Sequence, residues 1–307
     1  MHIGFGQNTV SSLYGHQKGD YMKTIGFSHD IADAEVLRIM ASNGVKLLAL
    51  RCAGFNNVDL NAAAAAGITV VRVPAYSPYA VAEYTVALML SLNRKIPRAS
   101  WRTKDGNFSL HGLMGFDMHG KTAGIIGTGK IAKILIHILK GFGMNILAYD
   151  LYPDYNFARE EKIVYTSLDE LYHSSDIISL HCPLTEATKY LINDYSISKM
   201  KDGVMIINTG RGQLIHTNAL IEGLKNKKIG SAGLDVYEEE SEYFYEDQSD
   251  RIIDDDVLAR LLSFNNVIVT SHQAFFTHEA LENIAMTTLQ NIRDFINHKP
   301  LLNEVKK

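Results

Sequence analysis

Short apolar runs alternate with helical periodicity through the middle of the chain. Thr122–Ile126 is an apolar run that stops at Gly127, as expected of a strand buried in a parallel sheet. Apolar residues then recur at the spacing of one helix face, at Ile131, Ile134, Leu135, Ile138, Leu139 and Phe142. Two glycines end this pattern before the next apolar run, Asn145–Tyr149. The pattern predicts a β-α-β unit with its turn at Gly127-Thr128-Gly129.

The same alternation continues to near residue 270. Ser167 and Glu170 have the spacing of a capping box before a short helix, and Thr217 is expected to cap a helix that ends near residue 226. Four further strands are predicted, at residues 176–180, Val204–Asn208, Ile229–Leu234 and 267–270. Six strands separated by helices or long crossovers require a mostly parallel sheet covered on both faces. The predicted fold class is therefore α/β, with a doubly wound parallel sheet.

The segments outside this sheet predict a second domain. More than a hundred residues precede the glycine turn, and residues 279–296 predict a C-terminal helix that could pack back on the first part of the chain. Between them, Ser77 can cap a long apolar helix that begins at Pro78, and this helix is either a core element or one shared between domains or subunits. We expect a discontinuous substrate domain (1–77 and 274–307), a linking or dimerisation helix (78–100) and a cofactor domain (101–273).

The glycine turn has the spacing of a dinucleotide-binding fingerprint. Gly127-x-Gly129-x-x-Ala132 follows a predicted strand and opens a helix, and Asp150 ends the next strand. The first glycine permits a tight turn, the second lets a pyrophosphate approach the backbone, and the helix N-terminus offers free N–H groups. Asp150 can accept both ribose hydroxyls and repel a 2′-phosphate, which favours NAD over NADP. The alternative is a glycine turn used only for packing.

Polar residues and glycines follow each predicted strand. In doubly wound sheets, ligands bind outside the carboxyl ends of the strands, so these residues should converge on one crevice. In chain order they are Gly127-Thr128-Gly129, Asp150, Cys182-Pro183, Thr209-Gly210-Arg211-Gly212, Asp235 and Ser271-His272.

Composition narrows the class of protein. The 30 basic and 34 acidic residues give a net charge of -4, which offers no electrostatic footprint for nucleic acid. Cys52 and Cys182 form no CxxC pair, and His111, His119 and His137 lack ligand spacing, so we expect neither disulfides nor a metal site. Neither a secretory signal nor an apolar run of membrane-spanning length is visible. We expect a cytoplasmic globular protein without nucleic-acid or membrane partners.

Seven segments together resemble one family. They are residues 51–59, 73–78, 124–150, 181–185, 208–212, 235–238 and 271–275, and they follow the family's order from about residue 22 onward. The chain resembles the D-isomer-specific 2-hydroxyacid dehydrogenases, and within them the fermentative NAD-dependent D-lactate dehydrogenases. This resemblance implies a Rossmann domain inserted into a smaller flavodoxin-like substrate domain made from both chain ends. It also implies a homo-oligomer, either a dimer or a dimer of dimers.

The resemblance also assigns roles to residues. Arg211 would bind the substrate carboxylate and polarise the C2 carbonyl, His272 would donate a proton, and Glu240 would pair with His272. The implied substrate contacts are Phe27, Ala53, Gly54, Tyr76, Arg211 and His272. The implied contacts with NAD are Gly127, Gly129, Lys130, Ile131, Asp150, Cys182, Pro183, Thr188, Thr209, Gly210, Arg211 and Asp235.

These residue types suit the reduction of a 2-keto acid. Negative charge develops on the C2 oxygen as hydride arrives, so a cation and a proton source are needed beside it. Arginine keeps its charge, and its fork can bridge two oxygens. An imidazole titrates near neutral pH, so His272 could give a proton in one direction and accept it in the other, with Glu240 stabilising the imidazolium. Cys182 is expected as a small neighbour of the nicotinamide and not as a nucleophile.

Three points stay open in the sequence. Residues 235–256 are so acidic that Glu238 or Glu239 could be the partner of His272 in place of Glu240. The substrate could be pyruvate or a bulkier 2-keto acid, because Phe27 and Tyr76 would set the volume of the pocket.

The third point concerns the start of the chain. Residues 1–21 do not resemble the strand and helix that family members carry there, so we expect an abbreviated substrate domain. That shortening favours the alternative of a non-catalytic relative, a dinucleotide-sensing protein of the corepressor kind. Arg211, Glu240 and His272 favour the enzyme.

Overall fold

The computed structural model describes residues 22–26, 31–239, 244, 247 and 249–306. The chain forms two compact units. Residues 78–275 make the central unit, and residues 1–77 with 276–307 make the discontinuous unit. The predicted abbreviation at residues 1–21 and the predicted site residues Phe27 and Glu240 lie outside the described residues.

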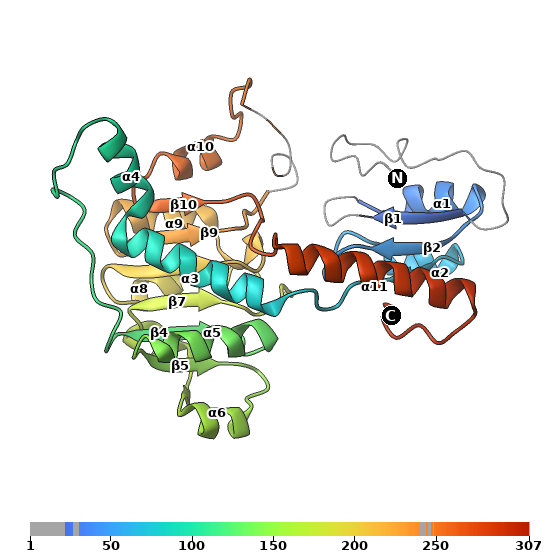
Figure 1. Ribbon diagram of the computed structural model, residues 1–307, viewed down its shortest axis with the longest axis horizontal. Coiled ribbons are helices and arrows are strands. Elements are labelled where there is room, and N and C mark those ends of the chain that lie inside the picture. Colours follow the sequence, from blue (N-terminus) through green and yellow to red (C-terminus); the bar gives the residue numbers. More distant parts are fainter. Residues whose placement is uncertain (1–21, 27–30, 240–243, 245–246, 248, 307) are drawn as a thin grey trace. The chain divides into compact units, whose positions relative to one another are not determined.

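The central unit contains a parallel sheet of seven strands in the order β10-β9-β8-β7-β4-β5-β6 (Figure 1). The strands are β4 (Thr122–Ile126), β5 (Asn145–Tyr149), β6 (Val164–Tyr165), β7 (Ile177–Leu180), β8 (Val204–Asn208), β9 (Ile229–Leu234) and β10 (Val267–Val269). The α/β class and the six predicted strands are confirmed, each strand to within one residue. Strand β6 was not predicted, because two residues are too short to show a periodicity.

Helices cover both faces of this sheet, as a parallel sheet requires. The helices of this unit are α3 (Pro78–Arg94), α4 (Ile96–Lys104), α5 (Lys130–Gly141), α6 (Tyr155–Glu161), α7 (Leu168–Ser174), α8 (Asp194–Lys199), α9 (Thr217–Lys225) and α10 (Asp256–Leu262), with a 3₁₀ turn, η2 (Gly212–Leu214), and α4 alone among these helices has no buried residue. Successive strand residues point to opposite faces. Ile125 therefore packs in the cluster of α3 and α5, whereas Ile126 packs in the cluster of α7, α8 and α9.

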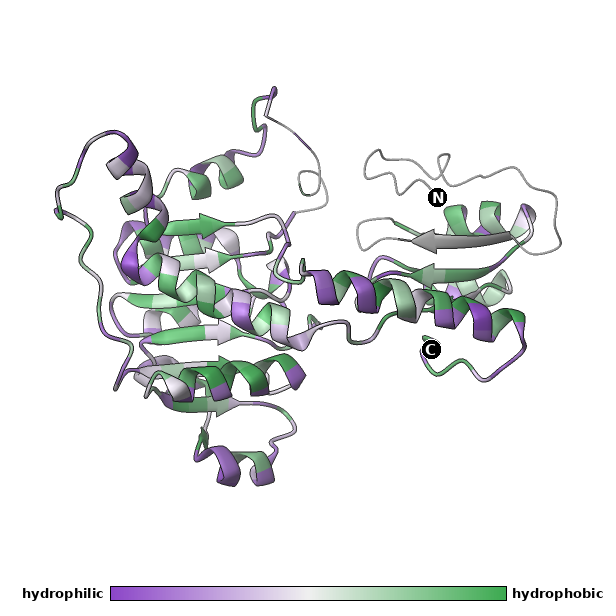
Figure 2. Ribbon diagram, viewed as in Figure 1, coloured by the Kyte–Doolittle hydropathy of each residue, from purple (hydrophilic) through white to green (hydrophobic). Residues whose placement is uncertain are grey.

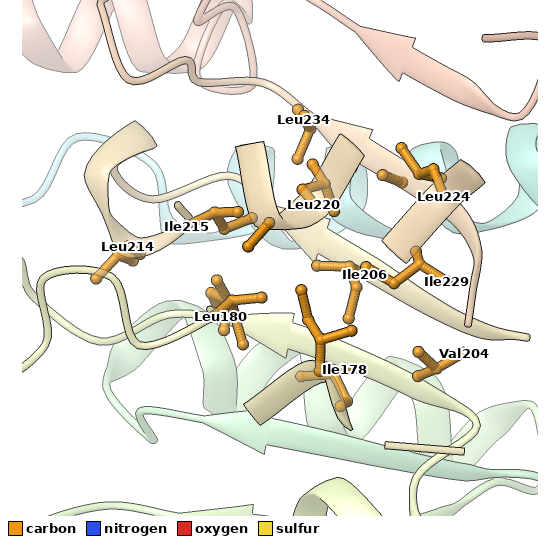
Figure 3. Packing of buried hydrophobic residues seen from close by; sticks show 14 of the residues in the cluster. Ile178, Leu180, Val204, Ile206, Leu214, Ile215, Leu220, Leu224, Ile229 and Leu234 are labelled. Carbon is orange, nitrogen blue, oxygen red and sulfur yellow. The ribbon is translucent and has the colours of Figure 1, made fainter. Parts of the chain in front are cut away.

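The buried clusters are almost wholly aliphatic. On one face, Met89 of α3 and Leu135 and Leu139 of α5 are completely buried against the sheet. On the other face, the side chains drawn in Figure 3 from β7, β8 and β9 interdigitate with Leu220 and Leu224 of α9. Figure 2 colours β7 and β8 hydrophobic along most of their length.

Two predicted helix starts differ in detail. The Ser167 hydroxyl accepts from Glu170 N, but the Glu170 carboxylate accepts from Ser174, so only half of the capping box forms. Thr217 is the first residue of α9 and not its cap, because its hydroxyl donates to Glu238. That acceptor lies 21 residues further along the chain, where no local pattern reveals it.

The apolar helix predicted from Pro78 belongs to the central unit. Its buried residues Ala82 and Met89 pack in the same cluster as Leu139. The helix ends at Arg94, Lys95 adopts the left-handed conformation with φ of 51°, and α4 follows. None of the helices that the structure describes combines the length and apolar character needed to cross a bilayer.

The discontinuous unit contains a parallel sheet in the order β1-β2-β3. Its elements are β1 (Met22–Gly26), α1 (Ala34–Ser42), β2 (Val45–Leu50), α2 (Leu60–Ala65), β3 (Thr69–Val71) and α11 (His278–Ile296). Leu37 of α1 and Leu48 of β2 share one buried cluster, while Leu47 packs with Ile292 and Phe295 of α11. The predicted C-terminal helix thus covers one face of this small sheet.

Leu135→Ala should destabilise the central unit. Leu135 is fully buried on α5, so truncation removes apolar contacts and leaves a cavity, which costs about 2–5 kcal/mol. Urea denaturation followed by circular dichroism measures the loss. The matched control is His137→Ala on the exposed side of the same helix, which should change the free energy of unfolding by less than about 0.5 kcal/mol. Equal effects of the two substitutions would contradict the packing described.

Candidate active site

The strand order brings the predicted site residues of the central unit to one edge of the sheet. The edge carries His272 beyond β10, Asp235 after β9, Thr209 to Arg211 after β8, Cys182 beyond β7, Gly127 after β4 and Asp150 after β5. The order reverses between β4 and β7, because the chain first adds β5 and β6 on one side and then β7 to β10 on the other. Such a reversal is where doubly wound sheets bind their ligands.

Gly127 makes the turn at this reversal. Its φ is +89°, and its N–H donates to Tyr149 O at 2.8 Å. A Cβ at this position would lie 2.5 Å from the backbone nitrogen of Cys182. Both the backbone angle and the neighbouring strand end therefore require glycine here.

Gly129 differs from Gly127, because its φ is −68° and a Cβ would meet no atom within 4 Å. It stands at the N-terminus of α5, where no side chain caps the helix. Ala132 is fully buried and allows α5 to pack close to the sheet. The open space beside the uncapped N–H groups fits the pyrophosphate of a dinucleotide, with Lys130 exposed and Ile131 half-buried in the first turn.

Asp150 is tied to the glycine turn. Its Oδ2 accepts from Thr128 N at 2.6 Å and from Thr128 Oγ1 at 3.0 Å, and its Oδ1 accepts from Tyr152 N at 2.9 Å. Burial opposes the charged form, but the hydrogen bonds outweigh it and lower the pKa of Asp150. The carboxylate is thus ionised at neutral pH, as the predicted contact with ribose requires. Thr128, which the sequence placed in the turn without a role of its own, orients this carboxylate and accepts from Tyr165 OH at 2.8 Å.

The loop after β7 presents a neutral thiol. Burial raises the pKa of Cys182 to about 11, which agrees with the prediction that it is not a nucleophile. Thr188 acts on this loop, since its hydroxyl donates to Pro183 O at 2.7 Å and accepts from Thr185 N at 2.8 Å. Burial also lowers the pKa of the neighbouring His181 to about 4, so its imidazole is neutral at physiological pH.

The turn after β8 is fixed by Asn208. Its side-chain oxygen accepts from Gly210 N at 3.0 Å, and its amide donates to Arg211 O at 2.9 Å. The Arg211 guanidinium donates to Gly210 O at 2.8 Å. Thr209 lies 3.0 Å, hydroxyl to hydroxyl, from a threonine of α3 that already donates to a main-chain carbonyl, so Thr209 is the donor in this pair. Its hydroxyl is thereby turned toward α3.

Asp235 supports the turn that carries His272. Its carboxylate accepts from Thr270 Oγ1 at 2.6 Å, Gln273 N at 2.9 Å and Ala274 N at 2.8 Å, and its carbonyl accepts from His272 N at 2.7 Å. His272 has φ of 53°, an unusual angle that this set of bonds fixes. Burial raises the pKa of Asp235, although the hydrogen bonds favour its carboxylate. The direct contact of Asp235 with NAD stays a prediction.

Glu238 is one of the candidate partners of His272 in the acidic segment, and it has assigned hydrogen-bond donors. Glu238 accepts from Tyr190 OH and from the N–H and hydroxyl of Thr217. Glu239 is exposed, and Glu240 lies outside the described residues. The pairing of Glu240 with His272 therefore stays a prediction.

The remaining predicted substrate contacts belong to the discontinuous unit. Ala53 O accepts from Arg72 at 2.8 Å, and Gly54 O accepts from the Cys52 thiol at 3.2 Å. Tyr76 O accepts from Asn283 of α11 at 2.8 Å. The contact of the Ala53 and Gly54 N–H groups with a substrate carboxylate stays a prediction.

No cluster of three or more His, Cys, Asp or Glu side chains suited to a metal ion occurs among the described residues.

The two glycines of the turn should respond differently to alanine. Gly129→Ala should leave the melting temperature nearly unchanged, because its Cβ meets no protein atom, but it should crowd the pyrophosphate. NADH binding, measured by fluorescence titration, should weaken by about 1–3 kcal/mol, roughly 5- to 150-fold. Gly127→Ala should lower the melting temperature or prevent folding, because its Cβ collides with the Cys182 backbone. Unchanged NADH affinity in Gly129→Ala would place the cofactor elsewhere.

Comparison with known proteins agrees with this geometry. The family model described as "D-isomer specific 2-hydroxyacid dehydrogenase, NAD binding domain" matches residues 86–274. The D-lactate dehydrogenase of Escherichia coli K12 is 54% identical over 279 residues, which are 91% of this chain and 84% of that protein.

Solved structures give the same result. The chain is similar to the structure described as the pyruvate reductase of Chlamydomonas reinhardtii, with a TM-score of 0.87, 48% identity and coverage of 92% of this chain and 85% of that one. It is also similar to the D-lactate dehydrogenase of Aquifex aeolicus complexed with NAD and lactic acid, with a TM-score of 0.82, 36% identity and coverage of 94% and 85%. The resemblance seen in the sequence is confirmed: the chain belongs to the D-isomer-specific 2-hydroxyacid dehydrogenase family and is an NAD-dependent oxidoreductase.

Proposed function

We propose that this dehydrogenase reduces a small 2-keto acid, and that its substrate is pyruvate, which it converts to D-lactate. The observation that carries the proposal is the placement of Arg211 and His272 at the same edge of the sheet, one after β8 and the other beyond β10. The names of the Escherichia coli and Chlamydomonas relatives support pyruvate as the keto acid. Cys182 carries a thiol outside any disulfide, which suits a reducing compartment such as the cytoplasm.

Arg211 binds and polarises the substrate in this proposal. Its guanidinium is permanently charged and can bridge the carboxylate and the C2 oxygen through two donors. Asn208 fixes the main chain on both sides of the residue, so the arginine starts from a defined backbone. NADH, when bound, supplies the hydride. Arg211 then stabilises the negative charge that develops on the C2 oxygen.

His272 supplies the proton to that oxygen. Its backbone is fixed by the bonds of Asp235 to both sides of the turn, which favours a constant position of the ring. Glu240, as the partner of the imidazole, would stabilise the protonated form that reduction consumes. In the opposite direction the neutral imidazole accepts the proton of the 2-hydroxy acid.

His272→Gln should abolish turnover. Glutamine keeps hydrogen-bonding capacity but cannot supply a proton at neutral pH, so kcat for pyruvate reduction should fall by about 100-fold or more. Oxidation of NADH at 340 nm measures kcat, and NADH affinity should stay within about twofold because the glycine turn is untouched. A wild-type protein that binds NADH but reduces no member of a 2-keto acid panel would contradict the enzyme and favour a dinucleotide sensor. A preference for larger keto acids would correct the substrate only.

We also propose that the protein is a homo-oligomer, through α4 and the loop to residue 117. This segment exposes Trp101 (69%), Phe108 (77%), Leu110 (83%) and Met114 (87%), and no residue of α4 is buried. Arg102 donates to the carbonyls of Ser109 and His111 at 2.9 Å, so the loop has a defined conformation. Apolar side chains gathered on a fixed surface are typical of a protein interface, and a second copy of the chain would cover them.

A double substitution tests this surface. Trp101→Glu with Phe108→Glu should shift the protein from a dimer or tetramer to a monomer in light-scattering chromatography, because charges cannot be buried in an apolar contact. Tyr152→Glu is the control, since Tyr152 is 87% exposed elsewhere in the central unit. A wild-type monomer at all concentrations, or a double variant that keeps its mass, would contradict the proposal.

A further inference from the structure

Glu238 connects three segments that are far apart in the sequence. One carboxylate oxygen accepts from Tyr190 OH, and the other accepts from Thr217 Oγ1 at 2.8 Å and Thr217 N at 3.3 Å. The hydrogen bond from Tyr190 raises the pKa of that phenol, so it stays a donor near neutral pH. Thr217 is buried, and Glu238 and Tyr190 are partly buried. Both oxygens of Glu238 are therefore engaged within the protein.

The carboxylate takes the place of a helix cap. His216 stands at the cap position of α9 but makes no side-chain hydrogen bond to the helix. The first N–H groups of a helix need an acceptor, and a negative charge there is favourable to the helix dipole. Glu238 supplies both from outside the helix. The start of α9 is thus fixed to the loop that follows β9.

The segment between Arg211 and α9 is enclosed by these same residues. A Cβ on Gly212 would lie 1.9 Å from Tyr237 O and 2.5 Å from Glu238 N, so the two backbones are in direct contact. On the other side, Tyr190 N donates to Gln213 O at 2.8 Å. Tyr190 itself has φ of 54°, and its ring meets His216 edge-on at 5.1 Å. The residues that follow Arg211 therefore contact Tyr190 on one side and the backbone of Glu238 on the other.

We propose that Glu238 is a positioning residue for Arg211. By joining Tyr190 to Thr217 it fixes the backbone immediately after Arg211, and so sets where the guanidinium meets the carboxylate of the 2-keto acid. The inference rests on the proposed function of Arg211. The donors assigned to Glu238 are Tyr190 and Thr217, which suits a carboxylate that acts through its geometry, and the experiment separates this role from a pairing with His272.

Replacing Glu238 by glutamine distinguishes a role that depends on the hydrogen bonds of the side chain from a role that depends on its charge. In Glu238→Gln the amide oxygen can accept from Thr217, and the amide nitrogen can donate to the Tyr190 oxygen. The bridge then survives without the charge. In Glu238→Ala both connections are lost, and the Thr217 N–H loses its acceptor. A partner of the catalytic imidazole would tolerate neither substitution.

The experiment compares Glu238→Ala, Glu238→Gln and Glu222→Ala. Glu222 is an exposed carboxylate of α9 that pairs with Lys225, so it controls for loss of a charge on the same helix. In Glu238→Ala, kcat/KM for pyruvate should fall about tenfold or more, mostly through KM, while NADH affinity stays within about twofold. Glu238→Gln should recover kcat/KM to within about threefold of wild type, and Glu222→Ala should match wild type. The pH profile of kcat/KM should keep its midpoint in Glu238→Gln.

Each contrary result has a distinct meaning. The proposal is overturned if Glu238→Ala keeps the wild-type kcat/KM. It is also overturned if the substitution lowers the melting temperature but leaves KM unchanged, because Glu238 would then have a structural role only. A shifted pH midpoint in Glu238→Gln would make Glu238 the partner of the histidine and also overturn it. Absence of turnover in the wild-type protein would instead contradict the proposed function.

Discussion

The close contact of β4 and β7 at Gly127 is the constraint on which the rest of the central unit depends. These parallel neighbours lie where the strand order reverses, because β5 and β6 are added beside β4 and β8 to β10 are added beyond β7. The ends of β4 and β7 approach so closely that a Cβ on Gly127 would collide with the Cys182 backbone. At this contact β4 turns directly into α5 through Gly127, whose φ is +89°, and no side chain caps the N-terminus of α5. The reversal that opens a crevice for a ligand and the helix end that suits its phosphates thus have one geometric origin.

Along that edge, polar side chains act mainly on the backbone. Asn208 fixes the Arg211 turn, Asp235 fixes the His272 turn, and Glu238 joins the start of α9 to the next loop. A buried carboxylate such as Asp235 is unfavourable unless donors surround it, and here two backbone N–H groups and a hydroxyl do so. The same bonds that satisfy the buried charge hold the His272 backbone at an unusual angle. The hydrogen bonds that stabilise the loops at this edge therefore also orient the backbone of Arg211 and His272.

The sequence predicted most of the strands because each contains a short run of mainly apolar or small residues between turn signals, and β7 and β8 are buried along their whole length. Strand β6 lacks the length for any such signal, and the predicted cap at Thr217 failed because its hydroxyl serves a carboxylate from a distant loop. The edge residues were predictable from their position after each strand. What the pattern could not separate was one glutamate from another in residues 235–256, since their roles depend on which donors the fold brings to them.

Asp150 combines a structural role in the glycine turn with its predicted role in the choice of cofactor. Its oxygens accept from Thr128 and Tyr152, yet each carboxylate oxygen has two lone pairs, so both can still accept from ribose hydroxyls. The hydrogen bonds keep the group ionised, and that charge disfavours a 2′-phosphate. Thr128 lies between the two glycines, so the acid predicted to select NAD also fixes the turn predicted to approach the pyrophosphate. Replacing Asp150 to admit NADP would therefore loosen the phosphate turn as well, and a change of cofactor preference at this position requires a new acceptor for Thr128.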